Sequence, residues 1–504
     1  MRLTIADTIA LRCLAFPERP AIEVIGSHRI ITYGEAWRRI SALAGAIPSS
    51  ACGRHGRMVG LLLPNGPDAA LALAACQFAG VVAVPVNGRL TPAEMRHILG
   101  DADCRVLLTG GQFTDVASQV CAGLPIEVID TASVPTPREV PRPVFGEREV
   151  GTQWCVVGYT SGTTGFPKGA IYTCDYYTMN NYRWGWEFGL SADHTILIAG
   201  PMFHLSYAGF ALAGLTIGAR VRILPEFSAA AALDELATRC SFAFLVPTML
   251  QMLVEEWRQR GQPPVTAARH ILSAGAPAPL ELLRDAMRMF PAARIAEMYG
   301  WTEGSFATYE VKEAGTLLPN SVGWPALGAD VALFGEDGEP CTAGTPGEVG
   351  VRGPVPFAGY LGNPQATAAA HHRGYVMSGD IGVFHADGRL RIIDRKKDMI
   401  ITGGENVYTI EVERVLLEFP GIRECAVVGL SDERWGEQVA ALLVPDGPPP
   451  ATEQLLAFCR TRLAAYKVPR RVAFADGLPR NSMGKVQKAA VTEILTAATA
   501  ADGS

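Results

Sequence analysis

Short apolar runs alternate with helical segments over residues 58–299, and this alternation constrains the fold more than any other feature of the sequence. An apolar run from Met58 to Leu63 stops at a Pro-Asn-Gly turn, and a helical segment and a second apolar run, Val81 to Val84, follow. A strand–helix–strand unit of this kind is the building block of a parallel sheet. The same alternation continues from Phe242 to Tyr299. The sequence therefore predicts an α/β protein.

The texture of the sequence changes after Pro319, where short β-like runs are separated by Asp-Gly turns. These runs predict a small antiparallel or barrel-like section that ends at about Asp394. A charged junction, Arg395-Lys396-Lys397-Asp398, comes next, and a compact α+β segment follows it. Because 504 residues are too many for one hydrophobic core, we predict two domains: a large one over residues 1–394 and a small one over residues 395–504.

Charge, cysteine content and hydropathy argue against several classes of protein. The formal net charge of −6 disfavours a nucleic-acid partner, because neutralising phosphates needs a basic surface. The 11 cysteines lie singly, without a Cys-x-x-Cys pair, which is typical of a reducing cytoplasm and argues against disulfides and a zinc site. The longest apolar stretch, from Ala69 to Val84, contains Gln77 and Gly80, so we expect no membrane span. The N-terminal residues lack a cationic stretch followed by a long apolar run, so we expect no secretion signal and a cytoplasmic location.

One segment, Tyr159 to Gly169, combines hydroxyl-bearing residues, glycines and a lysine directly after an apolar run. Its backbone N–H groups and hydroxyls can surround phosphate oxygens while Lys168 supplies positive charge. The segment is not a Walker-type phosphate loop, because Pro167 precedes the lysine and a glycine follows it. A flexible surface loop is the alternative interpretation. The candidate phosphate-binding residues are Thr160, Ser161, Gly162, Thr163, Thr164, Gly165 and Lys168.

This segment resembles the phosphate loop of the adenylate-forming superfamily, which includes acyl- and aryl-CoA synthetases, firefly luciferase and the adenylation domains of peptide synthetases. Further segments similar to the signatures of this superfamily follow in the same order along nearly the whole chain. They are Pro201–His204, Ser273–Pro277, Tyr299–Glu303, Ser378–Asp380, Asp394–Asp398 running into Gly403–Asn406, and Pro479–Lys485. The resemblance implies a large N-terminal domain of two αβ-layered sheets plus a small β-barrel, followed by a small, mobile α+β domain.

The resemblance also implies a reaction in two steps: a carboxylic acid and ATP give an acyl-adenylate and pyrophosphate, and coenzyme A then takes the acyl group. Lys485 would contact the carboxylate and the α-phosphate, Thr302 would bind the α-phosphate, and Glu303 would ligate Mg²⁺. Asp380 would accept hydrogen bonds from the ribose hydroxyls, with Arg395 beside it. The remaining nucleotide-binding residues implied by the resemblance are Gly275, Ala276, Pro277, Met298, Tyr299, Gly300, Trp301 and Ile392.

The segment that begins at Pro201 resembles the border of the family's acyl pocket, and its His204 is counted among the catalytic residues. The chain lacks the residues by which relatives select amino, malonyl or acetyl groups: residues 203–207 contain no aspartate, Met298 replaces an arginine, and Gly300 replaces a tryptophan. We therefore expect a medium-length, long or bulky hydrophobic acid. Because a methylene contributes only about 1–3 kcal/mol to discrimination, the sequence does not name the acid. The predicted pocket residues are His204, Tyr207, Ala208, Gly209, Val246, Gly300, Ser305 and Phe306.

For the second step, the resemblance implies that the small domain rotates about a hinge residue, Lys397. Two residues depart from the family pattern. Trp301 stands where a smaller side chain is common, and Thr409 stands where proline is frequent, a difference that we expect to matter little. The residues implied for coenzyme A binding are Gly403 and Gly404 in the pantetheine tunnel, with Trp435, Tyr466 and Arg470 near the nucleotide end.

Other functions remain open. An acyl-AMP ligase that delivers to an acyl carrier protein is one alternative, although no obvious insertion lies between Tyr299 and Asp380. A luciferase-like oxygenase is a weaker one. A non-catalytic nucleotide-binding homologue belongs to another class, but the four residues whose loss would indicate it are all present: Lys168, Glu303, Asp380 and Lys485. The expected partners are a small carboxylic acid, ATP and coenzyme A, and the protein is expected to be a monomer or a homodimer.

Overall fold

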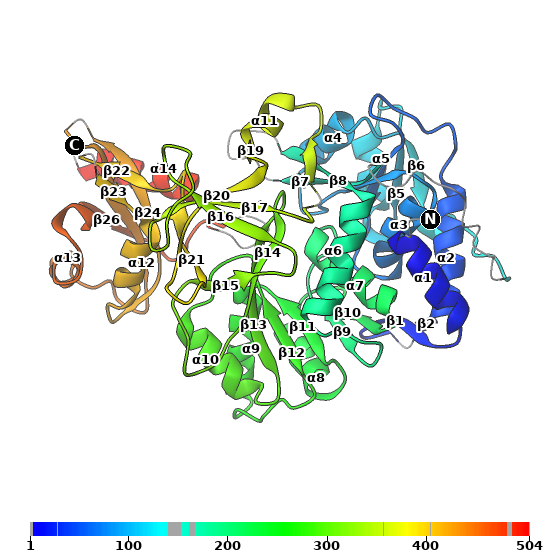
Figure 1. Ribbon diagram of the computed structural model, residues 1–504, viewed down its shortest axis with the longest axis horizontal. Coiled ribbons are helices and arrows are strands. Elements are labelled where there is room, and N and C mark those ends of the chain that lie inside the picture. Colours follow the sequence, from blue (N-terminus) through cyan, green and yellow to red (C-terminus); the bar gives the residue numbers. More distant parts are fainter. Residues whose placement is uncertain are drawn as a thin grey trace. The chain divides into compact units, whose positions relative to one another are not determined.

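The computed structural model describes residues 4–27, 29–139, 153–160, 167–355, 357–403, 405–432, 434–480 and 486–502 (Figure 1). The chain divides into two compact units. The large unit comprises Met1–Val331 with Gly350–Ser378, and the small unit comprises Ala332–Val349 with Gly379–Ser504. The mixed α/β architecture expected from the sequence is confirmed. The domain boundary predicted after Asp394 marks the segment about which the small domain is expected to rotate. This boundary stays a prediction.

The first sheet of the large unit has the strand order β18-β8-β7-β4-β3-β5-β6. From β7 to β6 the paired strands are parallel, whereas β8 runs antiparallel to both β7 and β18. The predicted strand–helix–strand unit over residues 58–84 is confirmed as β3, α3 and β4. The bounds are β3 Met58–Leu62, α3 Pro67–Phe78, β4 Val82–Pro85, α4 Pro92–Asp101, β5 Val106–Thr109, α5 Thr114–Cys121, β6 Glu127–Asp130, β7 Trp154–Thr160, β8 Lys168–Thr173 and β18 Phe357–Tyr360.

The second sheet contributes to the large unit the run β15-β14-β13-β12-β11-β9-β10-β1-β2. Its strands are parallel from β13 to β1, and antiparallel strands close both ends. The predicted strands and helices between Phe242 and Tyr299 are confirmed as β11, α9, β12, α10 and β13. The bounds are α1 Ile5–Ala15, β1 Pro20–Val24, β2 Ile30–Thr32, α2 Tyr33–Ala46, α6 Cys174–Glu187, β9 Thr195–Ile198, α7 Leu205–Ile217, β10 Arg220–Ile223, α8 Ala229–Thr238, β11 Phe242–Leu245, α9 Pro247–Gln259, β12 His270–Ser273, α10 Leu280–Met289, β13 Arg294–Trp301, β14 Ser305–Val311, β15 Ser321–Pro325 and α11 Pro364–Ala369.

Helices α1, α2, α3 and α7 fill the space between the two sheets of the large unit. One buried cluster joins residues of the first sheet, such as Val59 and Val156, to residues of the second, such as Ile196 and Phe242. Helix α7 is buried along nearly its whole length, and a helix that is apolar all round is typical of such an enclosed layer. The outer faces are covered by α8, α9 and α10 on the second sheet and by α4 and α5 on the first.

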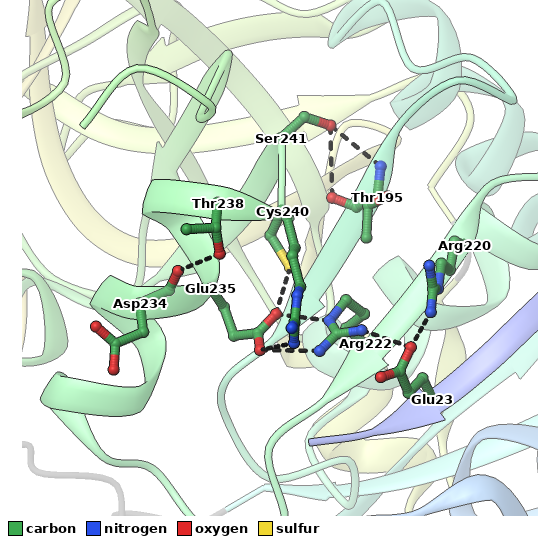
Figure 2. A network of polar contacts seen from close by, with 10 residues as sticks. Glu23, Thr195, Arg220, Arg222, Asp234, Glu235, Thr238, Cys240 and Ser241 are labelled. Carbon is green, nitrogen blue, oxygen red and sulfur yellow. Dashed lines mark hydrogen bonds and ion pairs between the residues drawn. The ribbon is translucent and has the colours of Figure 1, made fainter. Parts of the chain in front are cut away.

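A buried network of ion pairs fastens β1, β10 and α8 together (Figure 2). Arg222 is 2% exposed, and its Nε lies 2.6 Å from Oε2 of Glu235. Its Nη1 lies 2.5 Å from Oε2 of Glu23, which also pairs with Arg220. Removing one member of a buried ion pair leaves the other charge unpaired, which costs about 3–5 kcal/mol. This network therefore fixes the register of the sheet edge farthest from β13.

The small unit contains β21 (Leu390–Arg395) and a second sheet with the order β23-β22-β25-β24, in which β26 pairs with β25. The predicted Asp-Gly turn at Gly388 is confirmed between β20 and β21, with φ +86° at the glycine. Helices α12 and α13 cover one face of the second sheet and α14 covers the other. No helix in the described part of the chain is long and apolar enough to cross a membrane. The remaining bounds are β16 Asp330–Phe334, β17 Gly347–Arg352, β19 His371–His372, β20 Tyr375–Phe384, β22 Ile400–Thr402, β23 Glu405–Val407, α12 Thr409–Leu417, β24 Ile422–Asp432, β25 Gly436–Pro445, α13 Thr452–Arg460, β26 Arg471–Phe474 and α14 Lys488–Asp502.

Candidate active site

The predicted phosphate loop connects two antiparallel strands of the first sheet. β7 ends at Thr160 and β8 begins at Lys168, and these two residues are partners in the ladder. The two residues that border the predicted loop therefore lie opposite each other in the first sheet. Ser161, Gly162, Thr163, Thr164 and Gly165 lie outside the described residues.

A polar cavity of about 560 Å³ adjoins the second end of this loop, where Lys168 lies. Arg54 and His55 join Lys168 in lining it, so cationic or titratable nitrogen groups come from two separate segments of the chain. Asp101, also in the lining, accepts a hydrogen bond of 2.6 Å from the Tyr159 hydroxyl. Neither Arg54 nor His55 carries a sequence motif that predicts this position.

The predicted catalytic turn, Thr302 and Glu303, connects β13 to β14. Gly300 is required here by the backbone: a Cβ at this position would stand 1.7 Å from the carbonyl oxygen of Ser305. Ser305 has φ +56°, a left-handed conformation that side chains rarely adopt. The sequence suggests that Gly300 keeps the acyl pocket open. The tight hairpin is a second reason why glycine is needed at this position.

Two tyrosines that the sequence analysis did not select join this turn to strands β8 and β18 of the first sheet. The Tyr172 hydroxyl, on β8, donates a hydrogen bond of 2.6 Å to the Thr302 carbonyl oxygen. The Tyr360 hydroxyl, on β18, donates to Oε1 of Glu303. Lys168 Nζ lies 5.5 Å from the centroid of the Tyr360 ring. The structure thus brings Lys168, Thr302 and Glu303 together in the large unit.

Burial and the neighbouring carboxylate keep these phenols protonated. Burial raises the pKa of Tyr172, and the charge of Glu303 adds to the shift. Burial also raises the pKa of Tyr360, and its hydrogen bond to Glu303 raises it further. Both hydroxyls therefore remain donors at neutral pH. No local sequence signal could have identified Tyr360, because its position depends on the pairing of β18 with β8.

The predicted adenine-binding turn follows β12. Gly275 has φ +93°, which favours glycine, and its Cβ position would lie 3.5 Å from Val246, a predicted acyl-pocket residue. Ala276 and Pro277 are exposed beside it. The backbone N–H of Ala278 then donates a hydrogen bond of 3.2 Å to Glu297.

A buried network of ion pairs is connected to this turn through Glu297, which accepts the hydrogen bond from Ala278. Lys312 Nζ, whose side chain is fully buried, lies 2.8 Å from Glu297 and 2.6 Å from Glu310. Burial raises the pKa of Glu297, and Lys312 opposes that shift. The network anchors β13, whose later residues Met298 and Tyr299 are half-buried and belong to the predicted nucleotide site. The Tyr299 and Trp301 rings lie 5.6 Å apart.

The other predicted acyl-pocket residues lie on α7 and β14. His204 caps α7, with its Nδ1 3.4 Å from the Ser206 N–H donor. Tyr207, Ala208 and Phe306 are each at most 2% exposed. Gly209 faces Trp184 of α6, because a Cβ on it would lie 2.6 Å from the indole ring. Phe306 pairs with Gly300 across the hairpin, which brings the β14 part of the pocket to the catalytic turn.

The predicted ribose-binding residues belong to the small unit. Asp380 and Arg395 are ladder partners on β20 and β21, and Arg395 Nε lies 3.1 Å from Oδ1 of Asp380. Asp380 is 6% exposed, and Ile392 is buried on the same strand as Arg395. Lys485, predicted as the catalytic lysine, lies outside the described residues.

Three residues predicted to bind coenzyme A contact one another in the small unit. The Gly403 N–H donates a hydrogen bond of 2.8 Å to the Trp435 carbonyl, and a Cβ on Gly403 would lie 2.9 Å from the indole ring. The Arg470 guanidinium lies 4.7 Å from the centroid of that ring. Arg434, which the sequence analysis did not select, lies 4.9 Å from it. Tyr466 packs on the core of the small unit, and Gly404 lies outside the described residues.

The predicted hinge residue, Lys397, is exposed in the turn after β21. A buried polar contact lies next to it. Both the N–H and the Oγ1 hydroxyl of Thr409 donate to Asp394, the latter at 3.1 Å, and Lys488 Nζ donates to Thr409 Oγ1 at 2.5 Å. Thr409 is fully buried, and proline at this position would lack the N–H that Asp394 accepts. Thr409 therefore makes contacts that proline could not make, and the expectation that this departure matters little stays a prediction.

Known proteins are similar to this chain over nearly its whole length. Residues 10–361 match the family model described as AMP-binding enzyme, and residues 411–485 match the AMP-binding enzyme C-terminal domain. A feruloyl-CoA synthase of Amycolatopsis sp is 37% identical over 469 residues, which cover 92% of this chain and 93% of that protein. A long-chain-fatty-acid–CoA ligase of Mycobacterium tuberculosis is 32% identical, with 87% of this chain and 88% of that protein covered. The solved structure of the o-succinylbenzoate CoA synthetase of Bacillus subtilis with its acyl-adenylate intermediate has a TM-score of 0.83 and 30% identity, and the match covers 95% of this chain and 96% of that one.

Proposed function

Because the chain belongs to the family of AMP-binding enzymes and is an AMP-forming acid–thiol ligase, we propose that its site activates a bulky or medium-to-long, largely hydrophobic carboxylic acid. ATP and coenzyme A are its co-substrates. The observation that carries the proposal is the connection of two signature segments by Tyr172 and Tyr360, which bring the Thr302–Glu303 turn to the strand that starts at Lys168.

In the first half-reaction, a carboxylate oxygen attacks the α-phosphorus of ATP and pyrophosphate leaves. Two anions must approach each other, so fixed donors and cations have to stand where the charge accumulates. We assign the β- and γ-phosphates to Lys168 and the loop before it. Thr302 holds the α-phosphate, and the hydrogen bond from Tyr172 to its carbonyl fixes the turn.

Mg²⁺ fits the chemistry of Glu303. One carboxylate oxygen of Glu303 accepts the Tyr360 hydroxyl, and the second oxygen is a hard ligand of the kind that Mg²⁺ prefers. Mg²⁺ commonly uses one or two carboxylates together with substrate phosphates, which matches a single acidic residue at a turn. When bound, the ion neutralises phosphate charge. Tyr360 acts here as a positioning residue that holds the orientation of the carboxylate.

We assign the ribose hydroxyls to Asp380, whose ion pair with Arg395 keeps its two oxygens in place. Lys485 is proposed as the group that contacts both the attacking carboxylate and the α-phosphate. A flexible stem with a compact charge suits a cation that must be present only during adenylation.

In the second half-reaction, the coenzyme A thiol attacks the acyl-adenylate and AMP leaves. We assign Gly403 to the thiol-bearing arm; it packs so closely on Trp435 that a side chain there would meet the indole ring. Arg434 and Arg470 stand at the Trp435 ring and would meet the phosphates of coenzyme A. Rotation of the small domain about Lys397 would remove Lys485, which serves the first half-reaction, and bring in the residues assigned to coenzyme A.

The proposal is tested by pyrophosphate release with ATP and Mg²⁺ over a panel of acids, with and without coenzyme A. Acid-dependent release, with acyl-CoA formed only when coenzyme A is present, is the expected result. Glu303→Gln should lower this release at least tenfold, whereas the same change at the exposed Glu313 should not. Acyl-AMP that ignores coenzyme A would identify a carrier-protein ligase instead. Absence of release with every acid would identify a non-catalytic homologue.

A further inference from the structure

Helix α6 is polarised in the opposite sense to an ordinary amphipathic helix. It packs against α7 and the first sheet (Figure 1), yet the side that it buries is polar. The buried residues of the helix are Cys174, Tyr177, Thr178, Asn180, Asn181, Arg183, Trp184 and Gly185, and six of them carry polar groups on large or medium-sized side chains. The large side chains on its exposed face are Tyr176, Met179, Tyr182 and Trp186. A helix normally buries its apolar stripe, so this inversion needs a compensating interaction inside the protein.

The buried face carries polar atoms that are not satisfied. Tyr177 Oη, Asn181 Oδ1, Arg183 Nε and Trp184 Nε1 are buried without a hydrogen-bond partner among the described residues. These four atoms belong to side chains that are each at most 6% exposed. Leaving a buried polar group unpaired is destabilising, and more so for a charged group. Four such atoms on one short helix indicate that a further partner belongs there.

Arg183 is the charged residue of this buried face, so it needs hydrogen-bond acceptors more than the others do. Its Nη1 lies 3.5 Å from both the Pro354 carbonyl and Asn180 Oδ1, and its Nη2 lies 3.2 Å from the Phe306 carbonyl. These are long contacts to neutral acceptors. The hydrogen bonds that its two terminal nitrogens make within the described ranges go to neutral oxygens, while Glu187 acts on it electrostatically. A buried guanidinium with only neutral partners is well suited to take an oxygen acceptor, above all an anionic one.

Arg183 and Trp184 both touch the predicted acyl pocket. The Arg183 guanidinium lies 5.3 Å from the centroid of Phe306. Trp184 lies against Gly209, where a Cβ would come within 2.6 Å of its ring. A second indole N–H, that of Trp301, is also buried without a partner in the described part of the chain. The unsatisfied donors of Arg183 and Trp184 therefore lie beside residues that are predicted to line the acyl pocket.

We propose that the buried face of α6 recognises a hydrogen-bond-accepting oxygen at the far end of the acyl substrate, with Arg183 and Trp184 as the specificity-determining donors. This inference rests on the proposed function and narrows its substrate class. The acid carries a second oxygen group, remote from the carboxyl that is activated. A carboxylate or a hydroxyl supplies the acceptor that Arg183 Nε and Trp184 Nε1 lack. The body of the acid stays apolar, to match Tyr207 and Phe306.

The test compares three acids on one cinnamate scaffold, which differ only in a 4-carboxy, 4-hydroxy or 4-methyl substituent. Wild-type protein should give a kcat/KM for one of the oxygen-bearing acids at least tenfold above that for the 4-methyl acid. Arg183→Met should lower this ratio about 10- to 100-fold, because it removes a hydrogen bond to a charged donor. It should leave the 4-methyl acid within about threefold. A higher kcat/KM for the 4-carboxy acid indicates an anionic acceptor, and a higher kcat/KM for the 4-hydroxy acid indicates a neutral one.

Trp186→Leu, on the exposed face of the same helix, is the matched control and should leave all three values unchanged. Trp184→Phe removes the indole N–H and keeps an aromatic ring, so it tests the proposal if Arg183→Met does not fold. A wild-type protein without preference for either oxygen acid overturns the inference, as does an Arg183→Met variant that loses activity equally on all three acids. Both outcomes leave the proposed function intact, since acid-dependent pyrophosphate release and acyl-CoA formation would still be observed.

Discussion

At the scale of single residues, the site depends on side chains that hold the chemical groups in place. Tyr172 and Tyr360 lie outside the signature segments, yet they connect the two segments that the reaction needs closest together. Their pKa values are raised by burial, so they donate hydrogen bonds throughout the neutral range. The geometry of Glu303 is therefore set by a residue on another strand.

Replacing Tyr360 by phenylalanine removes the hydroxyl that orients Glu303. We expect kcat/KM for ATP to fall roughly 10- to 150-fold, because a hydrogen bond to a charged group contributes about 1.5–3 kcal/mol. Tyr375→Phe is the matched control: it removes a hydroxyl that lies 2.8 Å from the exposed Asp330. Equal loss in both variants, measured by pyrophosphate release, would contradict the role of Tyr360.

Thr409 is a second residue whose importance becomes visible only in three dimensions. Thr409→Val deletes the hydroxyl between Asp394 and Lys488 inside the small unit. The loss should lower the free energy of unfolding by about 1–3 kcal/mol, since buried polar partners remain unsatisfied. Urea unfolding of the full-length protein measures this change. Thr461→Val, at an exposed hydroxyl, should change it by less than about 0.5 kcal/mol, and a similar cost for both would refute the argument.

At the scale of elements, β12 carries a titratable residue that makes the sheet sensitive to acid. The His270 and His194 rings lie 5.4 Å apart, and burial lowers the pKa of His270 to about 4, with His194 adding to the shift. The folded imidazole therefore stays neutral down to about pH 4. The unfolded chain takes up a proton below about pH 6.5, the ordinary value for histidine. The folded state should thus lose stability as the pH falls from about 6.5 to about 4.

This loss should amount to roughly 2–3 kcal/mol for His270, by the linkage between pKa and folding. Urea unfolding of the wild type and of His270→Asn at pH 7 and pH 4.5 separates it from the titration of other groups. The wild type should lose more stability between the two pH values than the variant does. An equal loss in both would show that His270 is not the group responsible.

The same elements show what the sequence could and could not predict. Strands such as β11 and β12 are buried on both faces, so each needs a continuous apolar run, and such runs are visible in the sequence. The pairing of β18 with β8 depends on distant segments and on a strand of four residues, which leaves no local pattern. The prediction of a hydrophobic acyl pocket rests on signature positions, and it passes over α6, whose polar buried face lies outside them. The sequence also does not predict that Lys312 supports β13, because a single lysine is ordinarily a surface residue.

At the scale of the whole molecule, the proposed mechanism requires the two half-reactions to be separable. Lys397 is an exposed residue in the turn after β21, and rotation there is the proposed switch between adenylation and thiolysis. Lys397→Pro fixes φ near −65° and restricts that rotation. We expect the variant to form acyl-AMP at a rate close to that of the wild type and acyl-CoA at least tenfold more slowly. Loss of both steps to the same extent, measured by quenched product analysis, would remove Lys397 from the mechanism.

The central claim is that one chain makes an acyl-adenylate and passes its acyl group to coenzyme A. The most direct measurement is a single-turnover experiment with enzyme in excess over a reactive acid, ATP and Mg²⁺ present, and coenzyme A added after the first product has formed. The account predicts acyl-AMP and pyrophosphate in equal amounts, followed by conversion of the acyl-AMP into acyl-CoA and AMP when coenzyme A arrives. Acyl-AMP that persists after the addition, or acyl-CoA that forms without any acyl-AMP, would contradict it.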